Sequence, residues 1–155
     1  MNVTAARAPA VAALMASSPL LRRYAVSQRG ARASLARARR ARDVLLAAVD
    51  PEVVGFAWLI VTRALDESAY LRLLLVAEGR QSAGIGAQLL EAIERAARRR
   101  GARHLVLLVT KTNRRARAFY QRHGYEHVGD LPRFVRPTID EALYAKEIRA
   151  TRERG

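Results

Sequence analysis

Between residues 69 and 110 the sequence places an apolar run, a turn with two glycines, a helical pattern and a second apolar run in succession. The first run is AYLRLLLVA, and the turn holds Gly84 and Gly86. From Gly84 to Arg100 apolar residues recur at helical spacing. The second run, HLVLLVT, is apolar almost throughout, which is typical of a strand covered on both faces. This order predicts a β-α-β unit with parallel strands and a right-handed crossover.

The chain before this unit predicts antiparallel strands. The segment DVLLAAVDPEVVGFAWLIVT has two runs rich in branched residues around Asp50-Pro51-Glu52, and proline suits the first central position of a turn. Together with AYLRLLLVA, it predicts three consecutive antiparallel strands between Val44 and Ala77. Two further short strands are expected at Tyr125–Gly129 and Ala142–Ile148.

The first 43 residues predict helices. Apolar residues at helical spacing indicate a helix over Thr4–Tyr24, which is interrupted near Pro19 because proline cannot continue a helix. A second helix is expected over Gln28–Arg42, with Ser27 as its N-cap. No strand is evident before the first helix. Later in the chain, Asn113 is expected to start and cap another helix.

These elements predict an α/β (α+β) fold with a mixed, mostly antiparallel central sheet, one β-α-β crossover and flanking helices. The chain has 155 residues, half of them apolar, which suits one domain with a substantial core. Within that single domain of residues 1–155, residues 1–43 would form a helical region and residues 44–148 the core.

The composition excludes several kinds of site. The chain has no cysteine, which rules out disulfides, thiolate metal ligands and a cysteine nucleophile. His104, His123 and His127 lie on different predicted elements without the spacing of metal ligands, so we expect no metal. No stretch approaches the roughly 20 apolar residues of a membrane span, and the start of the chain lacks a signal-peptide pattern. We therefore expect a cytoplasmic protein with no membrane partner.

The net charge of +14 could attract nucleic acid, acidic lipids or a polyanionic ligand. The basic residues are almost all arginine and are scattered through every segment. This favours a compositional bias plus one small anion site over a nucleic-acid footprint. Nucleic acid is therefore not an expected partner.

The glycine turn, GRQSAGIG, has two interpretations. Gly84 and Gly86 could simply let the chain turn tightly and pack a helix against a strand. Alternatively, bare amides at a helix start could bind an anion, because they have no acceptor inside the helix and the helix dipole favours negative charge there. The turn is not a P-loop, since no Gly-Lys-Ser/Thr follows, and the full dinucleotide fingerprint is absent.

Two motifs together point to a known family. The turn contains Q-x-x-G-x-G over Gln81–Gly86, and NRRARAFYQRHGYEHVG at residues 113–129 contains N-x-x-A-x-x-x-Y-x-x-x-G-Y. Both resemble the acyl-CoA signature of the GNAT superfamily of N-acyltransferases, and the resemblance extends from about residue 44 to residue 148. It implies the GNAT fold and, for residues 1–43, a place on the acceptor side.

The resemblance also implies a coenzyme site. The backbone around Val76 would hydrogen-bond the pantetheine arm of acetyl-CoA, and Asn113 would reach the same arm. The pyrophosphate would be held by backbone amides, those of Gln81, Ala83, Gly84, Gly86 and Ala87. The 3′-phosphate would meet an arginine; Arg117 is our candidate, and Arg80, Arg114 and Arg115 remain alternatives.

The implied reaction is direct attack of a primary amine, from a small molecule or a protein, on the acetyl thioester. Backbone N–H groups near Val76 would stabilise the oxyanion, and Tyr120 would act as general acid beside the coenzyme sulfur. No covalent enzyme intermediate is required, which agrees with the missing cysteine. A base must take a proton from the amine, and the nearest acid in the sequence is Glu78, with Asp66, Glu67 and Glu141 behind it.

The chain departs from the usual family pattern at three positions. Glu78 replaces a frequent proline, Ser82 replaces the usual glycine inside the turn, and Thr138 stands where related closing segments often have glycine. Two other functions stay open: a non-catalytic acyl-CoA-binding or regulatory domain and, less favoured, an arginine-rich nucleic-acid-binding protein. The sequence also leaves a monomer and a homodimer open.

Overall fold

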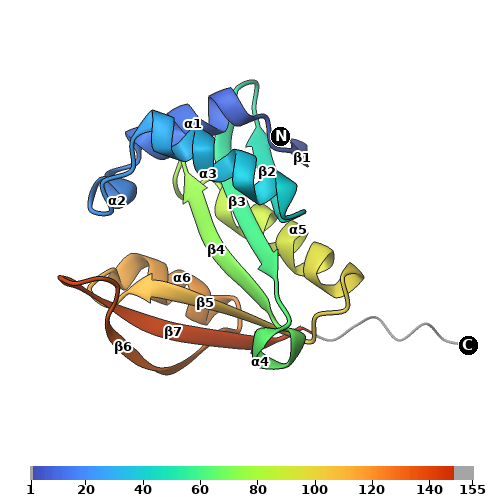
Figure 1. The fold of residues 1–155 in the computed structure, drawn as a ribbon, viewed down its shortest axis with the longest axis vertical. Coiled ribbons are helices and arrows are strands. Elements are labelled where there is room, and N and C mark those ends of the chain that lie inside the picture. Colours follow the sequence, from blue (N-terminus) through green and yellow to red (C-terminus); the bar gives the residue numbers. More distant parts are fainter. Residues whose placement is uncertain (1, 149–155) are drawn as a thin grey trace, which may run out of the picture. The chain divides into compact units, whose positions relative to one another are not determined.

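The computed structural model describes residues 2–148 (Figure 1). Its strands are β1 (Asn2–Ala5), β2 (Val44–Val49), β3 (Val53–Val61), β4 (Ala69–Val76), β5 (His104–Thr110), β6 (Glu126–Arg136) and β7 (Ile139–Glu147). Its helices are α1 (Ala8–Ser17), α2 (Pro19–Arg22), α3 (Gln28–Arg40), α4 (Ala64–Glu67), α5 (Ile85–Arg99) and α6 (Arg114–Arg122). Within this part of the chain, the strands form one sheet in the order β1-β2-β3-β4-β5-β7-β6. The mixed α/β fold predicted from the sequence is confirmed.

The chain divides into two compact units. The first runs to Ile60 and resumes over Leu73–Ala96, and the second consists of Val61–Arg72 and the chain from Ala97 onward. Strand β4 therefore begins in the second unit and ends in the first. The glycine turn belongs to the first unit, and helix α6 belongs to the second.

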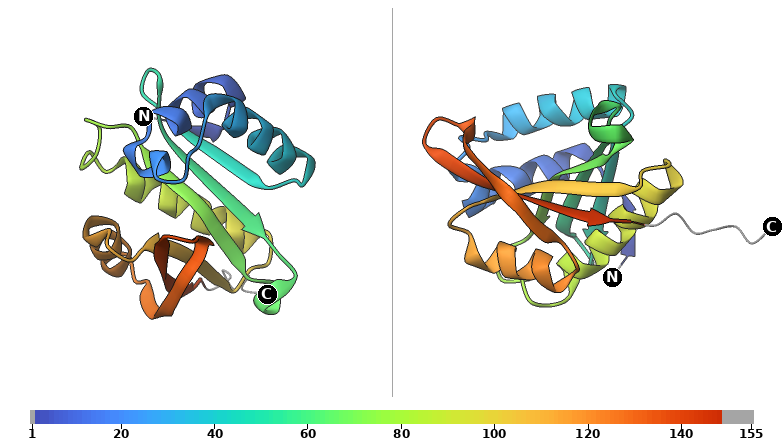
Figure 2. Two further views of the ribbon diagram at one scale, coloured as in Figure 1. Left: turned by 60° about the vertical axis from the view of Figure 1, so that its left-hand side comes forward. Right: turned by 90° about the horizontal axis from the view of Figure 1, so that it is seen from below.

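In the first unit, three antiparallel strands lie between two helical layers. Strand β2 pairs with β1 on one side and with β3 on the other, and the hairpin turn falls at Asp50–Glu52, as predicted. Helices α1 and α3 lie side by side (Figure 2) and cover Phe56 and Trp58 of β3. The indole Nε1 of Trp58 donates a hydrogen bond to Asp43 Oδ2 at 2.9 Å. Ala57 lies between them on β3 and faces the opposite side of the sheet, because successive strand residues alternate in direction. It is also fully buried, so both sides of β3 are covered here.

The start of the chain differs from the prediction. Residues Asn2–Ala5 form an edge strand, whereas the sequence predicts a helix from Thr4 and no strand before it. Four residues carry too little periodicity to reveal a strand, and the partner, β2, lies some 40 residues later in the chain. The predicted break at Pro19 is confirmed, because α1 ends at Ser17 and α2 begins at Pro19.

Helix α3 agrees closely with its prediction. Its N-cap is Ser27, whose Oγ accepts a hydrogen bond from the Gly30 amide at 3.0 Å. The helix ends at Arg40, two residues before the predicted end. Ala31, Leu35 and Ala38 form its buried face.

In the second unit, the parallel pairing predicted for the β-α-β unit is confirmed. The start of β4 pairs with β5 over Ala69↔Leu105, Tyr70↔Val106 and Leu71↔Leu107. Strand β5 then pairs antiparallel with β7 along its whole length, and β6 and β7 form a long hairpin, orange to red in Figure 2. The hairpin strands run further toward their shared turn than predicted, to Arg136 and from Ile139. None of the helices in residues 2–148 is long and apolar enough to cross a membrane.

Candidate functional site

The glycine turn links the end of β4 to the start of α5 within the first unit. The Ala77 amide donates to the Val54 carbonyl at 2.8 Å, and the Arg80 amide donates back to the Ala77 carbonyl at 3.0 Å. The chain thus leaves the sheet directly after Val76 and reverses. Ser82 and Gly84 then take left-handed backbone conformations, with φ of 71° and 77°.

Helix α5 presents its first amides at this turn. The Gln88 amide donates to the Gly84 carbonyl at 3.1 Å, which is the first helical hydrogen bond after the turn. The amides of Ile85, Gly86 and Ala87 precede it and have no acceptor inside the helix, and the helix dipole makes this end positive. A methyl group at Gly84 would meet no protein atom within 4 Å, so the space in front of the turn is open. This end of α5 is suited to an anion such as phosphate.

Gly55 of β3 allows helix α5 to pack closely against the strand, and the sequence analysis did not identify this role. A Cβ atom at Gly55 would lie 2.8 Å from Leu89 Cδ1, 3.0 Å from Ile85 Cγ2 and 3.2 Å from the Leu75 carbonyl oxygen. The first turns of α5 therefore pack directly on bare β3 backbone. A single glycine inside an apolar strand was the signal that could have revealed this close approach.

The charged side chains of the turn, Arg80 and Glu78, are accessible to solvent. Arg80, an alternative ligand for the 3′-phosphate, forms an exposed ion pair with Asp50 of the β2–β3 turn at 2.9 Å. Glu78, the predicted base, is exposed, as are Gln81 and Ala83. Arg80 therefore already has an anionic partner within the first unit.

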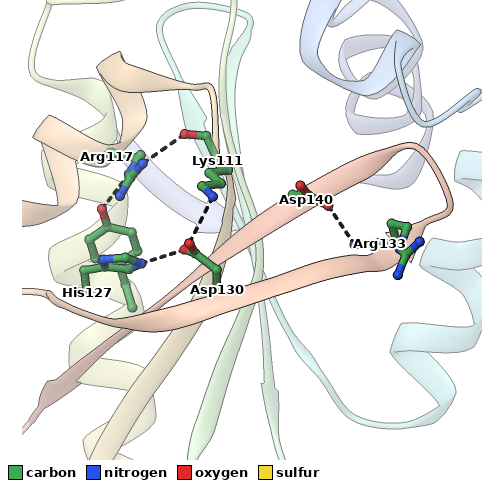
Figure 3. Close-up of polar contacts among 7 residues, drawn as sticks. Lys111, Arg117, His127, Asp130, Arg133 and Asp140 are labelled. Atoms are coloured by element: carbon green, nitrogen blue, oxygen red, sulfur yellow. Dashed lines mark hydrogen bonds and ion pairs between the residues drawn. The ribbon is translucent and has the colours of Figure 1, made fainter.

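The second unit places Asn113 and Arg117 around the start of α6. The Asn113 Oδ1 accepts a hydrogen bond from the Ala116 amide at 3.1 Å, which confirms its predicted role as N-cap. Arg117 donates from Nε to the Tyr144 hydroxyl at 2.9 Å and from its terminal nitrogen to the Lys111 carbonyl at 3.0 Å (Figure 3). These two hydrogen bonds hold the guanidinium in place, and neither is an ion pair with a carboxylate.

A polar network beside Arg117 was not predicted. Asp130 of β6 accepts a hydrogen bond from His127 at 2.9 Å and pairs with Lys111 at 3.2 Å (Figure 3). These two partners hold the pKa of the Asp130 carboxyl below its usual range. The His127 ring lies 5.3 Å from the ring of Tyr144. The network requires contact between β6 and the segment that links β5 to α6, and no local sequence pattern predicts this contact.

Tyr120, the predicted general acid, lies on the buried side of α6. Its ring makes edge contacts with Phe119 and Tyr125 at 5.1 and 5.6 Å between ring centroids. The residue is only 8% exposed, and burial raises the pKa of its phenol well above its usual range. The phenol therefore holds its proton at physiological pH and is a weaker acid than the phenol of an exposed tyrosine.

The four acidic candidates for the base differ in burial. Glu78, Asp66 and Glu67 are exposed, whereas Glu141 on β7 is only 2% exposed and lies opposite Thr110 of β5. Burial raises the pKa of Tyr70; Arg72 partly offsets this, and the charge of Glu141 adds to the rise. Glu141 is thus a buried acid in a polar environment of the second unit.

The predicted site residues fall into two groups. The first unit brings together the turn residues, which are Val76, Glu78, Gln81, Ala83, Gly84, Gly86 and Ala87. The second unit holds Asn113, Arg117 and Tyr120, which share the start and body of α6. The structure gives each group a definite local geometry, and the roles toward a coenzyme remain predictions.

Comparison with known proteins places this geometry in a family. Residues 14–125 match the model of the acetyltransferase (GNAT) family. No curated protein sequence matches the chain significantly.

Solved structures share the fold at low identity. An aminoglycoside 6′-N-acetyltransferase complexed with coenzyme A superposes with a TM-score of 0.81 at 18% identity, covering 99% of this chain and 100% of that one. The ribosomal-protein-alanine N-acetyltransferase from Brucella melitensis gives 0.78 at 22% identity, covering 95% and 99%. The ribosomal-protein-S18-alanine N-acetyltransferase from Escherichia coli gives 0.76 at 22%, covering 99% and 97%. With the family model matching most of the chain, the protein belongs to the acetyltransferase (GNAT) family and is an acyl-CoA-dependent N-acetyltransferase.

Proposed function

We propose that the protein transfers an acetyl group from acetyl-CoA to a primary amine of a small molecule or a protein. The observation that carries the proposal is the start of α5, where the first amides of the helix have no acceptor inside it and the space beside Gly84 is open. A diphosphate is the part of acetyl-CoA that such a group of amides fits.

In this proposal the amides of Gln81, Ala83, Gly84, Gly86 and Ala87 bind the pyrophosphate of the coenzyme. The end of β4 at Val76 supplies backbone groups for the pantetheine arm and N–H groups for the oxyanion. Asn113 would reach the same arm while capping α6, since its Oδ1 is used in the cap and its side-chain amide keeps two donors. Arg117, already positioned by Tyr144 and the Lys111 carbonyl, supplies positive charge for the 3′-phosphate.

The proposed chemistry is direct aminolysis. The neutral amine attacks the thioester carbonyl, the carbon–nitrogen bond forms, and the carbon–sulfur bond breaks to release coenzyme A. Tyr120 is the proposed donor of the proton that the leaving thiolate takes up; its phenol carries that proton at neutral pH, and its raised pKa makes it a weak acid. Before the attack, the ammonium form of the acceptor gives up a proton to a base and becomes the neutral amine; Glu78 is our assignment for this base, and Glu141 is the buried alternative.

The acceptor is proposed only as an amine. Two kinds of neighbour share the fold, one named for aminoglycosides and the other for the alanine of a ribosomal protein. Both are less than 25% identical to this chain, so they support the fold and the amine chemistry and do not choose between a small molecule and a protein.

Release of free thiol from acetyl-CoA, measured across a panel of aminoglycosides, polyamines and peptides with free N-termini, tests the proposal. Turnover with any acceptor supports it. Tight coenzyme binding in calorimetry without turnover on any amine would instead indicate a non-catalytic binder. Rates of Glu78→Gln and Glu141→Gln on the best acceptor, measured as a function of pH, then identify the base. The variant that lacks the base should lose the increase in rate with pH that comes from deprotonation of the amine.

A further inference from the structure

The net positive charge is concentrated at the start of the chain, because that segment has no acidic residues. Residues 1–42 contain nine of the 28 lysines and arginines, all of them arginine, and none of the 14 acidic residues. This segment therefore supplies nine of the fourteen net positive charges. An even bias toward arginine, as the sequence alone suggested, does not explain why a quarter of the chain lacks acids entirely.

Helix α3 displays much of this charge on one face. Ala31, Leu35 and Ala38 face the core, and the opposite side carries exposed arginines, namely Arg29, Arg32, Arg37 and Arg40. At a rise of about 1.5 Å per residue, Arg29 and Arg40 are about 16 Å apart along the axis. The four arginines form what we call the α3 basic face.

Among residues 2–148, no acid pairs with the α3 basic face. Within residues 2–148, none of its four arginines pairs with a carboxylate; Arg37 donates to Ser34 Oγ at 3.2 Å, a neutral partner. Asp43, the first acid in the chain, accepts a hydrogen bond from Trp58. Four adjacent guanidinium groups repel one another in the free protein, and a ligand with closely spaced negative charges relieves that repulsion.

We propose that the α3 basic face binds the phosphate backbone of a double-helical nucleic acid, without reading its base sequence. A duplex carries about one negative charge per 1.7 Å of axis, so a face about 16 Å long meets several phosphates at once. Arginine suits this task better than lysine, because its planar fork binds phosphate oxygens in pairs.

Other anionic partners fit this face less well. A membrane-binding helix needs an apolar side to insert, and the apolar side of α3 is already buried in the core. A single-stranded nucleic acid is held by stacking of bases on aromatic rings, and α3 contains no aromatic residue. A rigid duplex, bound through phosphates alone, needs neither feature.

The test compares two full-length variants with equal loss of charge. The first replaces Arg29, Arg32, Arg37 and Arg40 with glutamine. The control replaces four exposed arginines on other elements with glutamine, Arg63, Arg99, Arg103 and Arg122. Circular dichroism and coenzyme A binding, which the proposal expects to be unchanged in both variants, verify that each is folded and separate this inference from the acetyltransferase activity.

Binding is measured by fluorescence anisotropy with a short RNA duplex, a DNA duplex of the same sequence and a single strand, across a range of salt concentrations. Wild-type protein should bind at least one duplex more tightly than the strand, with a log–log salt slope of about −3 for three to four phosphate contacts. The first variant should bind at least about tenfold more weakly with a shallower slope, and the control should stay within about threefold.

Three results would overturn the proposal: no duplex binding by wild-type protein at physiological salt, equal losses in the two variants, or binding to phosphatidylserine vesicles without binding to either duplex. Binding to only one duplex supports the proposal and identifies RNA or DNA as the partner.

Discussion

Arg117 on α6 donates a hydrogen bond to the hydroxyl of Tyr144, a fully buried residue of β7, at 2.9 Å. This bond joins a helix surface to the interior of the sheet, and it fixes a cation that we assign to the coenzyme phosphate. We expect Tyr144→Phe to lower the free energy of unfolding by about 1.5–3 kcal/mol, because a hydrogen bond to a charged group is lost. Urea denaturation measures this change. If Tyr144→Phe is as stable as wild type, the bond does not position Arg117.

Gly84→Glu should abolish coenzyme A binding, because it places bulk and negative charge where the pyrophosphate is proposed to lie. Gly101→Glu is the matched control, since Gly101 also has a positive φ and open space around it, at the end of α5. Both variants bear a similar cost to folding. Calorimetry should therefore show binding by the control and none by Gly84→Glu, and retained affinity in Gly84→Glu would refute the assignment of the turn.

Gly55→Ala should destabilise the first unit and weaken coenzyme binding together. The added methyl group would lie 2.8 Å from Leu89 and 3.2 Å from the Leu75 carbonyl, so α5 must shift away from β3. Overpacking of this kind costs about 1–3 kcal/mol. Gly129→Ala is the control, because its new methyl group meets no atom within 4 Å. Equal stability of the two variants in thermal unfolding would mean that the position of α5 does not depend on its close contact with Gly55.

Tyr120→Phe should lower kcat while leaving coenzyme affinity nearly unchanged, since the hydroxyl is proposed to act only on the leaving thiolate. An unchanged kcat would remove Tyr120 from its acid role.

The raised pKa of Tyr120 also predicts how stability depends on pH. The folded state holds the phenol proton more tightly than the unfolded chain, in which tyrosine ionises near about pH 10. The stability that this proton supports is complete below that pH and is lost above it. Melting temperatures recorded from neutral to strongly alkaline pH should fall less steeply in Tyr120→Phe than in wild type.

Ser82→Gly should be tolerated or mildly stabilising. Ser82 adopts a φ of 71°, a conformation that costs a residue with a Cβ about 1 kcal/mol and glycine almost nothing. Ser34→Gly, the same substitution inside α3, should instead destabilise by about 0.5 kcal/mol. Chemical denaturation of the pair checks the sign. A clear loss of stability in Ser82→Gly would show that the serine side chain is needed in the turn.

The sequence predicted correctly those features of the fold that are determined by neighbouring residues. The turn at Asp50–Glu52, the caps at Ser27 and Asn113 and the break at Pro19 each depend on a few neighbouring residues, and each is present. Strand β1 was missed because only its pairing with β2 makes it a strand.

The site follows the same division. The glycine turn could be found because its glycines mark where the backbone turns, and Ser82 adopts a left-handed φ that glycine adopts at the least cost. The contact of Arg117 with Tyr144 and that of Asp130 with Lys111 could not be found, because each joins residues that are far apart in the sequence. Which residues come into contact in this way depends on tertiary packing, and a single sequence does not reveal tertiary packing.

Trp58, hydrogen-bonded to Asp43 beneath α1 and α3, is the only tryptophan of the chain and lies wholly in the first unit. Its fluorescence therefore reports on the unfolding of the first unit alone, whereas far-ultraviolet circular dichroism reports on both units. Coincident melting by the two signals would mean that the halves cooperate as one folding unit, and a split transition would mean that each can open while the other stays intact.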